Sequence, residues 1–184
     1  MNTMEHPVII STPSFVLKTL SVDDAQLLLN YYVNNKSHFE PWSALPDKNF
    51  YTLEFQKKKL EFDELTLNAQ KALRLWIFKN GDDKNIIGDI GFTNMIRGPF
   101  QSCNVGYKTD VNYLRQGVMY EALSASFKYI FTNLKLHRIE ANIIPSNIAS
   151  INLIKKLGFI EEGHVRQYLN INGKWHDHIR FSLI

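Results

Sequence analysis

The sequence predicts an α+β fold in which helices flank a mixed sheet of seven strands. Short apolar segments bounded by Gly, Pro, Asn and Asp recur along the chain, as is typical of strands, and longer segments with helical spacing lie between them. Asn172-Gly173 joins two of the strand-like segments, and this dipeptide is a strong hairpin signal. The 184 residues, 45% hydrophobic and 12% aromatic, suffice for one buried core and are few for two. We therefore expect one domain over residues 1–184.

The N-terminal third is expected to hold one strand and two helices. Residues 15–20 alternate in hydrophobicity and predict the first strand. Ser21 and Asp24 stand three positions apart, as in a capping box, so a helix is expected over residues 23–34. Leu, Phe, Lys and Glu at helical spacing predict a second, amphipathic helix over residues 52–70.

The middle and the C-terminal third predict an antiparallel meander, a helix, and a further strand, helix and hairpin. Turn residues separate the three strands of the meander. The expected elements are, in order, strands over 73–79, 86–94 and 102–109, a helix that carries Leu123, Phe127, Ile130 and Phe131, a strand over 136–144, a helix from Asn147 to Gly158, and strands over 160–170 and 174–182.

Composition and charge narrow the class of protein. The single Cys103 permits no internal disulfide, and its strand-like neighbours indicate a buried, inert thiol. The N-terminus lacks a basic segment ahead of an apolar one, and no apolar run approaches the roughly 20 residues of a membrane helix, so we expect an unanchored cytoplasmic protein. A net charge of +3 with dispersed Lys and Arg argues against a nucleic-acid partner. His176 and His178 share a strand face, but without a third ligand at a recognised spacing they predict no metal site.

Residues 114–120 give the first indication of a ligand. This short basic segment contains Gly117 and runs without a breaker into the helix that carries Leu123. The unpaired N–H groups of a first helical turn and the positive end of the helix dipole form an anion site, and Arg115 suits a phosphate. We therefore expect a phosphorylated ligand here, although an ordinary helix start after a glycine-containing connection is the alternative.

Several segments together resemble known proteins. They are HFEPW (residues 38–42), IIGDIGFTNMIRGPFQSCNVGY (86–107), HRIEANIIPSNIASINLIKKLGF (137–159) and EEGHVRQYLNINGKWHDH (161–178). With them the chain resembles the GNAT acetyltransferases, and within that superfamily the RimJ/RimL group of ribosomal-protein N-terminal acetyltransferases. The resemblance implies a largely antiparallel sheet whose fourth and fifth strands, here 104–108 and 138–144, splay apart to admit the pantetheine of acetyl-CoA.

The resemblance also implies how acetyl-CoA binds. The phosphate loop of the family reads Gln or Arg, two residues, Gly, one residue, then Gly or Ala, and only Gly117 fits it here, because Leu114 and Met119 occupy the outer positions. Backbone N–H groups make most contacts in such a loop, so these departures weaken the motif without breaking it. An Asn contact to the pantetheine is implied for Asn147, which could also be a helix cap. The implied cosubstrate-binding residues are Arg115, Gln116, Gly117, Val118, Met119 and Tyr120 in the loop, Asn147 and Ser150 at the next helix, and Val105, Gly106 and Tyr107 on the splayed strand.

Acetyl transfer to an amine needs an oxyanion donor and an acid for the departing thiolate. Many members of the superfamily place a tyrosine acid four residues before the Gly of a Gly-Phe pair, and this position is Ile154 here. The resemblance to RimL implies Ser150 as the substitute, acting by relay or by hydrogen bonding as charge develops. A backbone N–H near Val105, Gly106 or Tyr107 is the expected oxyanion donor, and the Tyr107 ring is expected in the core.

Two carboxylates and two aromatic residues complete the candidate site. Glu140 is the candidate catalytic base, together with Asp89, although an α-amine with a pKa near 8 is already partly neutral at pH 7. The alternative for Glu140 is an ion pair with Arg138, its same-face neighbour. Phe39 and Trp42 lie between the first two predicted helices, where the superfamily builds its acceptor site, and they form either a packed knot or a peptide-binding wall.

The resemblance implies an acetyl-CoA-dependent N-acetyltransferase. Its acceptor would be the N-terminal α-amine of a protein, a ribosomal protein beginning with Ala or Ser, which attacks the thioester directly in a ternary complex. Two other functions stay open: acetylation of a small amine or antibiotic, and a CoA-binding assembly factor without catalysis. A homodimer is compatible with the sequence, and neither a metal nor a membrane is expected to take part.

Overall fold

The computed structural model of the chain describes residues 7–43 and 46–184. Within these residues, one eight-stranded sheet has the strand order β1-β2-β3-β4-β5-β6-β8-β7. Neighbouring strands are antiparallel except β5 and β6, which are parallel. The strands are β1 (Ile9–Ser11), β2 (Phe15–Lys18), β3 (Leu73–Lys79), β4 (Ile86–Ile96), β5 (Ser102–Thr109), β6 (Arg138–Ile143), β7 (Ile160–Ile171) and β8 (Lys174–Leu183).

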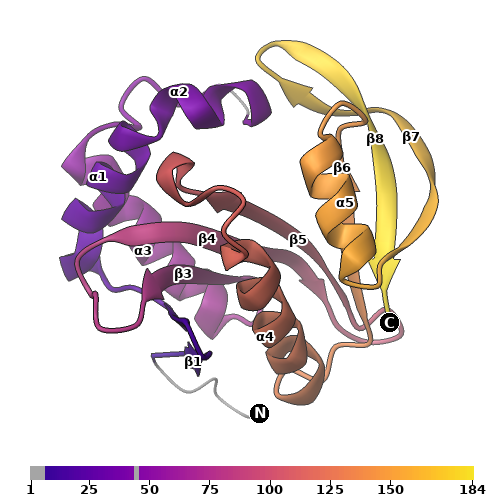
Figure 1. The fold of residues 1–184 in the computed structure, drawn as a ribbon, viewed down its shortest axis with the longest axis horizontal. Helices are drawn as coiled ribbons and strands as arrows, with labels where there is room; N and C mark the ends of the chain where they lie inside the picture. The colour runs from indigo at the N-terminus through magenta and orange to yellow at the C-terminus, as the bar shows by residue number, and fades with distance from the viewer. Residues whose placement is uncertain (1–6, 44–45) are drawn as a thin grey trace.

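Helices cover both faces of this sheet (Figure 1). Helices α4 and α5 pack on one face, here called the α4 face, and α1 and α3 pack on the other, the α3 face. Of the helices in the described part of the chain, none is both long and apolar enough to cross a membrane. The helices are α1 (Ala25–Asn34), α2 (Lys36–Phe39), α3 (Leu53–Asn68), α4 (Val118–Thr132) and α5 (Ile148–Lys156), with 3-10 turns η1 (Val22–Asp24), η2 (Glu40–Trp42) and η3 (Val111–Tyr113).

The α+β fold predicted from the sequence is confirmed, with eight strands in place of seven. The additional strand is β1, whose three residues pair with β2 at the edge of the sheet. A segment of this length is too short to show the alternation that identifies a strand in a sequence. All seven predicted strands are present, with ends that differ by a few residues.

Two apolar clusters hold the layers together, one on each face of the sheet. Along β3, Leu75 and Ile77 point to the α4 face, whereas Trp76 and Phe78 point to the α3 face, because successive strand residues alternate. All four side chains are at most 1% exposed. Burial of each such side chain contributes about 1.5–3 kcal/mol. The sheet is therefore fixed firmly on both sides up to the position where it opens.

The sheet opens between β5 and β6. Ser102–Asn104 pair with Arg138–Glu140, and within the described residues the pairing between these two strands ends there. β6 remains paired with β8 through Ile143, and β5 remains paired with β4 through Thr109. The two halves of the sheet thus diverge beyond Asn104, as the resemblance implied.

Candidate active site

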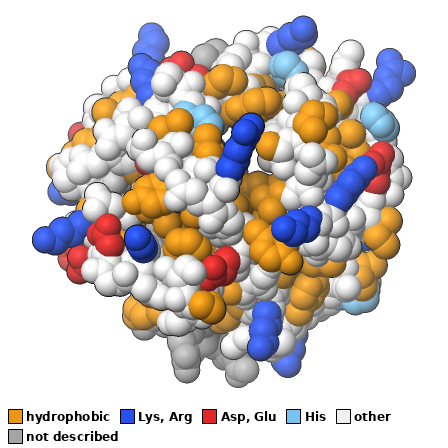
Figure 2. All heavy atoms as spheres, viewed as in Figure 1, with side chains coloured by type: hydrophobic (Ala, Val, Ile, Leu, Met, Phe, Trp, Pro, Cys, Tyr) orange, Lys and Arg blue, Asp and Glu red, His pale blue; other side chains and the backbone are white. Residues whose placement is uncertain are grey.

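The opening between β5 and β6 leads into a cleft of about 490 Å³. Residues 105–108 form one edge, and residues 141–144 form the other. Because side chains of a strand alternate between faces, a cleft bounded by four consecutive residues reaches both faces of the sheet. Figure 2 shows a hollow on the visible face, with hydrophobic side chains along it and Lys and Arg side chains around it.

The start of α5 forms the wall of the cleft on the α4 face. The side-chain oxygen of Asn147 accepts the backbone N–H of Ser150 at 3.1 Å, which is the bond of a helix N-cap. Both residues also line the cleft. Capping and ligand binding are therefore compatible roles for Asn147.

Tyr107 brings a second hydroxyl group to the same turn. Its hydroxyl donates to the backbone carbonyl of Ser150 at 3.4 Å. Burial raises the pKa of Tyr107 to about 12, so the phenol stays protonated at neutral pH and is able to donate. Sequence interpretation placed this ring in the core and missed the contact, because 43 positions separate the two residues.

A cluster of charged and tyrosine side chains lies where the cleft reaches the α3 face. The Asp89 side chain is 3% exposed, and its carboxylate accepts from the Arg74 guanidinium at 2.7 Å and from the Tyr31 hydroxyl at 3.3 Å. Lys108 lies with its ammonium 5.1 Å from the centre of the Phe39 ring, and burial lowers the pKa of this lysine. Asp89, Arg74 and Lys108 all line the cleft. This end of the cleft is therefore polar and suits an amine or an amide.

The first turn of α4 has the geometry of an anion site. Gly117 caps the helix with φ 79°, a left-handed conformation that glycine adopts without strain. Arg115, two residues earlier, also has a positive φ of 59°. The turn thereby directs the N–H groups of the first helical residues outward from the helix end, and Figure 1 shows this end of α4 beside the opening of the sheet.

The chain matches the acetyltransferase (GNAT) domain over residues 14–160. It belongs to the GNAT acetyltransferase family. The Bacillus subtilis protein named probable N-acetyltransferase YjcK is 35% identical over 162 residues, which cover 88% of this chain and 89% of that protein. The Escherichia coli ribosomal protein uS5-alanine N-acetyltransferase is 33% identical over 175 residues, 95% of this chain and 89% of that protein. The crystal structure of a ribosomal-protein-S5-alanine acetyltransferase from Vibrio fischeri superposes with a TM-score of 0.90 at 32% identity, covering 96% of each chain.

The GNAT chain is an acetyl-CoA-dependent N-acetyltransferase, and its expected cosubstrate residues fall into two groups. Residues 105–107, Asn147 and Ser150 line the cleft. The loop residues lie outside the cleft, at the N-terminal end of α4. Val118 and Met119 are 2% and 6% exposed, so their side chains belong to the core and only their backbone can meet a ligand.

Two other loop side chains of this acetyltransferase are engaged within the protein. The Gln116 side-chain amide donates to the Asn112 carbonyl at 2.8 Å and so closes the loop on itself. The Lys156 ammonium lies over the Tyr120 ring, 4.6 Å from its centre, and this contact connects the start of α4 with the end of α5. These contacts give the loop a fixed shape, and they leave Arg115 as the loop cation suited to a phosphate.

The structure separates the two aromatic residues expected at the acceptor site. Trp42 lines the cleft and is 44% exposed. Phe39 is 7% exposed, and its ring lies 5.4 Å from that of Tyr31 in the α3-face cluster. Trp42 is therefore accessible from the cleft, whereas Phe39 mainly supports Tyr31 and the Lys108 side chain.

Glu140 lies outside the cleft, in a group of charges on the sheet. Its carboxylate pairs with Arg138 at 2.7 Å and with Arg180 at 3.8 Å. Arg138 also pairs with Glu162. The ion pair that was the alternative for Glu140 is thus present. Of the two candidate bases, it is Asp89 that the structure places on the wall of the cleft.

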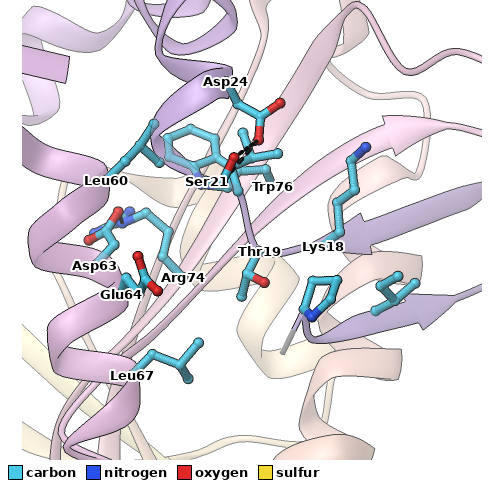
Figure 3. Close-up of a pocket in the computed structure, with 13 residues that line it drawn as sticks. Lys18, Thr19, Ser21, Asp24, Leu60, Asp63, Glu64, Leu67, Arg74 and Trp76 are labelled. Atoms are coloured by element: carbon cyan, nitrogen blue, oxygen red, sulfur yellow. Dashed lines mark hydrogen bonds and ion pairs between the residues drawn. The ribbon is translucent and has the colours of Figure 1, made fainter. Parts of the chain in front are cut away.

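A second pocket, of about 500 Å³, lies between α3 and the β1–β2 edge (Figure 3). Arg74 lines both this pocket and the cleft, and it also approaches Asp63 to 3.5 Å. Ser21 donates its backbone N–H to Asp24 at 2.9 Å at the far side, as the capping box predicted. Arg74 therefore lies between this pocket and the α3-face end of the cleft.

His178 lines the cleft, although the sequence suggested no role for it there. It was weighed as a metal ligand with His176, but in the structure it lines the cleft. Among the residues that the structure describes, there is no group of three or more His, Cys, Asp or Glu side chains placed to hold a metal ion. The strand β8 that carries His178 borders β6, and this long-range neighbourhood is invisible in the sequence.

Proposed function

We propose that this acetyltransferase acetylates the N-terminal α-amine of a protein, a ribosomal protein that begins with Ala or Ser. The observation that carries the proposal is a cleft that passes between β5 and β6 to both faces of the sheet. The α4 face offers hydroxyl groups and a helix N-terminus for acetyl-CoA. The α3 face offers an open, polar end for a chain terminus. Relatives that are named for acetylation of the alanine of uS5 support this acceptor, and such a substrate would place the enzyme in the cytoplasm.

In this proposal the β5 edge stabilises the charge that develops during transfer. As the amine nitrogen bonds to the thioester carbonyl carbon, a backbone N–H among residues 105–107 donates to the carbonyl oxygen. The carbon–sulfur bond then breaks, and the Tyr107 or Ser150 hydroxyl donates to the departing sulfur. Transfer is direct, because Cys103 is 1% exposed and its thiol is held in the core.

The acceptor end of the cleft is proposed to hold the peptide terminus beside Trp42 and Asp89. The Asp89 carboxylate accepts from Arg74 and Tyr31, and in this proposal it attracts the terminal ammonium into the cleft. Glu140 is proposed to hold β6 and β8 in register through its ion pair with Arg180. We place Arg115 and the N–H groups of 118–120 at the phosphates of acetyl-CoA.

A thiol-release assay tests this function. Acetyl-CoA is supplied with short peptides that begin with Ala, Ser, Thr or Met, each free and N-terminally blocked, and in parallel with spermine and an aminoglycoside. We expect turnover with the free Ala and Ser peptides and none with the blocked ones. Thiol release with the small amines alone would overturn the proposed class of acceptor. No thiol release with any acceptor would favour a non-catalytic CoA-binding protein.

A variant of Gly106 tests whether the cleft is the place of transfer. Gly106 is exposed, and a Cβ built there meets no described heavy atom within 4 Å, so a larger residue enters the cleft without disturbing the strand. We expect Gly106→Leu to reduce kcat/KM at least about 10-fold by blocking the passage, with an unchanged melting temperature. Gly106→Ala, which adds one methyl group, is the matched control with a smaller loss. Full activity of Gly106→Leu would place the reaction elsewhere.

A further inference from the structure

His178 is a buried imidazole at the acceptor end of the cleft. It is 2% exposed and lines the cleft together with Leu169 and Ile171 of the C-terminal hairpin. Its neighbour Ile179 points into the α4-face core and pairs with Ile143 at the end of β6. By alternation along β8, His178 therefore points to the α3 face, where the acceptor is proposed to enter.

The hydrogen bond of one ring nitrogen fixes the tautomer of His178. Nδ1 lies 3.0 Å from the backbone carbonyl oxygen of His176. A carbonyl oxygen only accepts, so Nδ1 carries a hydrogen, and in the neutral ring the lone pair resides on Nε2. Within residues 7–43 and 46–184 the structure gives Nε2 no hydrogen-bond partner. The ring also lies edge-on to Tyr168, with 5.4 Å between centres, which holds its orientation.

The surroundings keep this ring neutral. Burial lowers the pKa of His178 below its ordinary value, and the nearby His176 lowers it further, while the His176 carbonyl and Asp177 oppose the shift. The titratable and charged groups around it are Tyr168 on β7, Arg180 on β8 beside the Tyr168 ring, and, on the walls of the cleft, Tyr32, Lys59, Arg74, Asp89, Tyr107 and Lys108. At pH 7 the imidazole is therefore a base with a free lone pair, and protonation at lower pH removes that function.

We propose that Nε2 of His178 accepts the proton that the acceptor amine loses on its way to the amide. The α-ammonium passes a proton to Nε2, directly or through one water molecule, and the ring becomes an imidazolium whose Nδ1–H stays on the His176 carbonyl. The freed lone pair of the amine forms the C–N bond, and the thiolate leaves with the electron pair of the C–S bond. The nitrogen then gives up its second proton, which reaches the departing sulfur through the Tyr107 or Ser150 hydroxyl or a water molecule, so that a neutral amide and a neutral thiol result. The imidazolium finally returns its proton to water. This inference rests on the proposed acceptor, since it requires an amine that is mostly protonated.

His178→Asn is the informative variant, because its amide N–H₂ retains a donor for the His176 carbonyl but lacks a basic nitrogen. The exposed His164→Asn on the facing strand is the matched control. Each is assayed with an Ala-peptide and with the same peptide carrying an aminooxyacetyl group in place of Ala. The aminooxy nitrogen is far less basic than an α-amine and is neutral at pH 7, so it needs no proton acceptor before attack.

We expect His178→Asn to lower kcat/KM for the Ala-peptide about 100-fold near neutral pH and to leave the aminooxyacetyl-peptide within a few-fold of wild type. The loss for the Ala-peptide should shrink as the pH rises above the amine pKa of about 8, because the solvent then deprotonates the amine. Activity of His178→Asn equal to wild type, or an equal loss with both acceptors at every pH, would overturn the proposal. His164→Asn should match wild type throughout.

Wild-type activity with the Ala-peptide and the NMR shifts of His178 distinguish failure of the proposed acceptor from failure of the proposed role of His178. If the wild type itself is silent with the Ala-peptide, the proposed acceptor fails and this inference fails with it; a wild type that is active beside an unaffected variant refutes the inference alone. Should His178→Asn fold poorly, the nitrogen NMR shifts of His178 in the wild type decide. A neutral ring with its hydrogen on Nδ1 at pH 7 is expected, and a hydrogen on Nε2 would refute the role.

Discussion

Tyr107 and Ser150 place two hydroxyl groups at one turn of the cleft, and their different acidity separates their roles. A phenol gives up a proton far more readily than an alcohol, even with its pKa raised to about 12 by burial. Ser150 donates its backbone N–H to Asn147 and its carbonyl accepts from Tyr107. Tyr107 is thus the stronger proton donor, while Ser150 holds the turn in place.

We expect Tyr107→Phe to lower kcat about 10- to 100-fold with little change in the KM for acetyl-CoA, since only a hydrogen-bond donor is lost. Because the folded pKa is raised, the phenol is protonated at all pH values below about 12, and no activity should be lost through its ionisation up to about pH 10. Steady-state kinetics from about pH 6 to 10 measure both effects. Ser150→Ala is the companion variant, and an unchanged kcat for it would remove that hydroxyl from the mechanism.

Arg74 and Asp89 form a buried ion pair that supports the α3-face end of the cleft. Arg74→Met would leave the Asp89 carboxylate, 3% exposed, with the Tyr31 hydroxyl as its remaining side-chain donor among the described residues. We expect a loss of about 3 kcal/mol in the free energy of unfolding, because a buried charge loses its counter-charge. Lys58→Met in the exposed pair with Glu54 is the control, and a far smaller change is expected because solvent screens this pair. Urea denaturation measures both, and equal losses would contradict this account.

Residue types and local spacing could be predicted from the sequence, but contacts across the sheet could not. Asn147 and Ser150 were expected at the site from the family resemblance, and their local spacing predicted the helix start at which they stand. The hydroxyl of Tyr107 and the imidazole of His178 reach the cleft through pairings between segments far apart in the chain. Phe39 was expected beside Trp42 at the acceptor, yet a buried ring contact with Tyr31 takes it into the core.

Among the elements, the turn into α4 is the one whose conformation depends on a single glycine. Gly117 has φ 79°, and a Cβ there meets no described heavy atom within 4 Å. We expect Gly117→Ala to cost about 1 kcal/mol of stability, since an L-residue is strained in the left-handed region. It should also weaken acetyl-CoA binding, because strain shifts the N–H groups of the first helical turn.

Gly81 provides a matched control for this prediction. Its φ is 81°, it too has open space around it, and it lies in the turn after β3. Gly81→Ala should cost a similar amount of stability and leave the affinity for acetyl-CoA unchanged in titration calorimetry. A loss of affinity in both variants would mean that global destabilisation, not the geometry of the α4 turn, controls binding.

Periodicity predicted the larger elements well and the smallest one not at all. Strands of seven or more residues, such as β3 and β8, repeat the alternation often enough to be recognised, whereas β1 has three residues. The divergence of β5 and β6 came from the family resemblance alone. It depends on which edges fail to pair, and a local pattern of apolar residues does not record that.

At the scale of the whole molecule, the sheet consists of two halves that share a seam of three paired residues. Ser102–Asn104 and Arg138–Glu140 form this seam, and its middle pair is Cys103 with Ile139. Within the described residues, further contacts between the halves run through the α4-face core and through the Asn172 side-chain amide, which donates to the Glu40 carbonyl at 3.0 Å. Any ligand that bridges residues 105–108 and 141–144 must therefore tie the halves together.

Because Cys103 lies in this seam, the rate at which its thiol becomes accessible to a reagent reports opening of the seam. The thiol is the sole one in the chain, it is 1% exposed, and burial raises its pKa to about 12, so it is unreactive while the seam is closed. The rate of alkylation by a maleimide at neutral pH then measures how often the two halves of the sheet separate and expose the thiol. We expect acetyl-CoA to slow this labelling, and mass spectrometry would follow it; a rate indifferent to acetyl-CoA would mean that the ligand does not span the opening. The labelling rate of Cys103 would therefore report how often β5 and β6 separate at the seam.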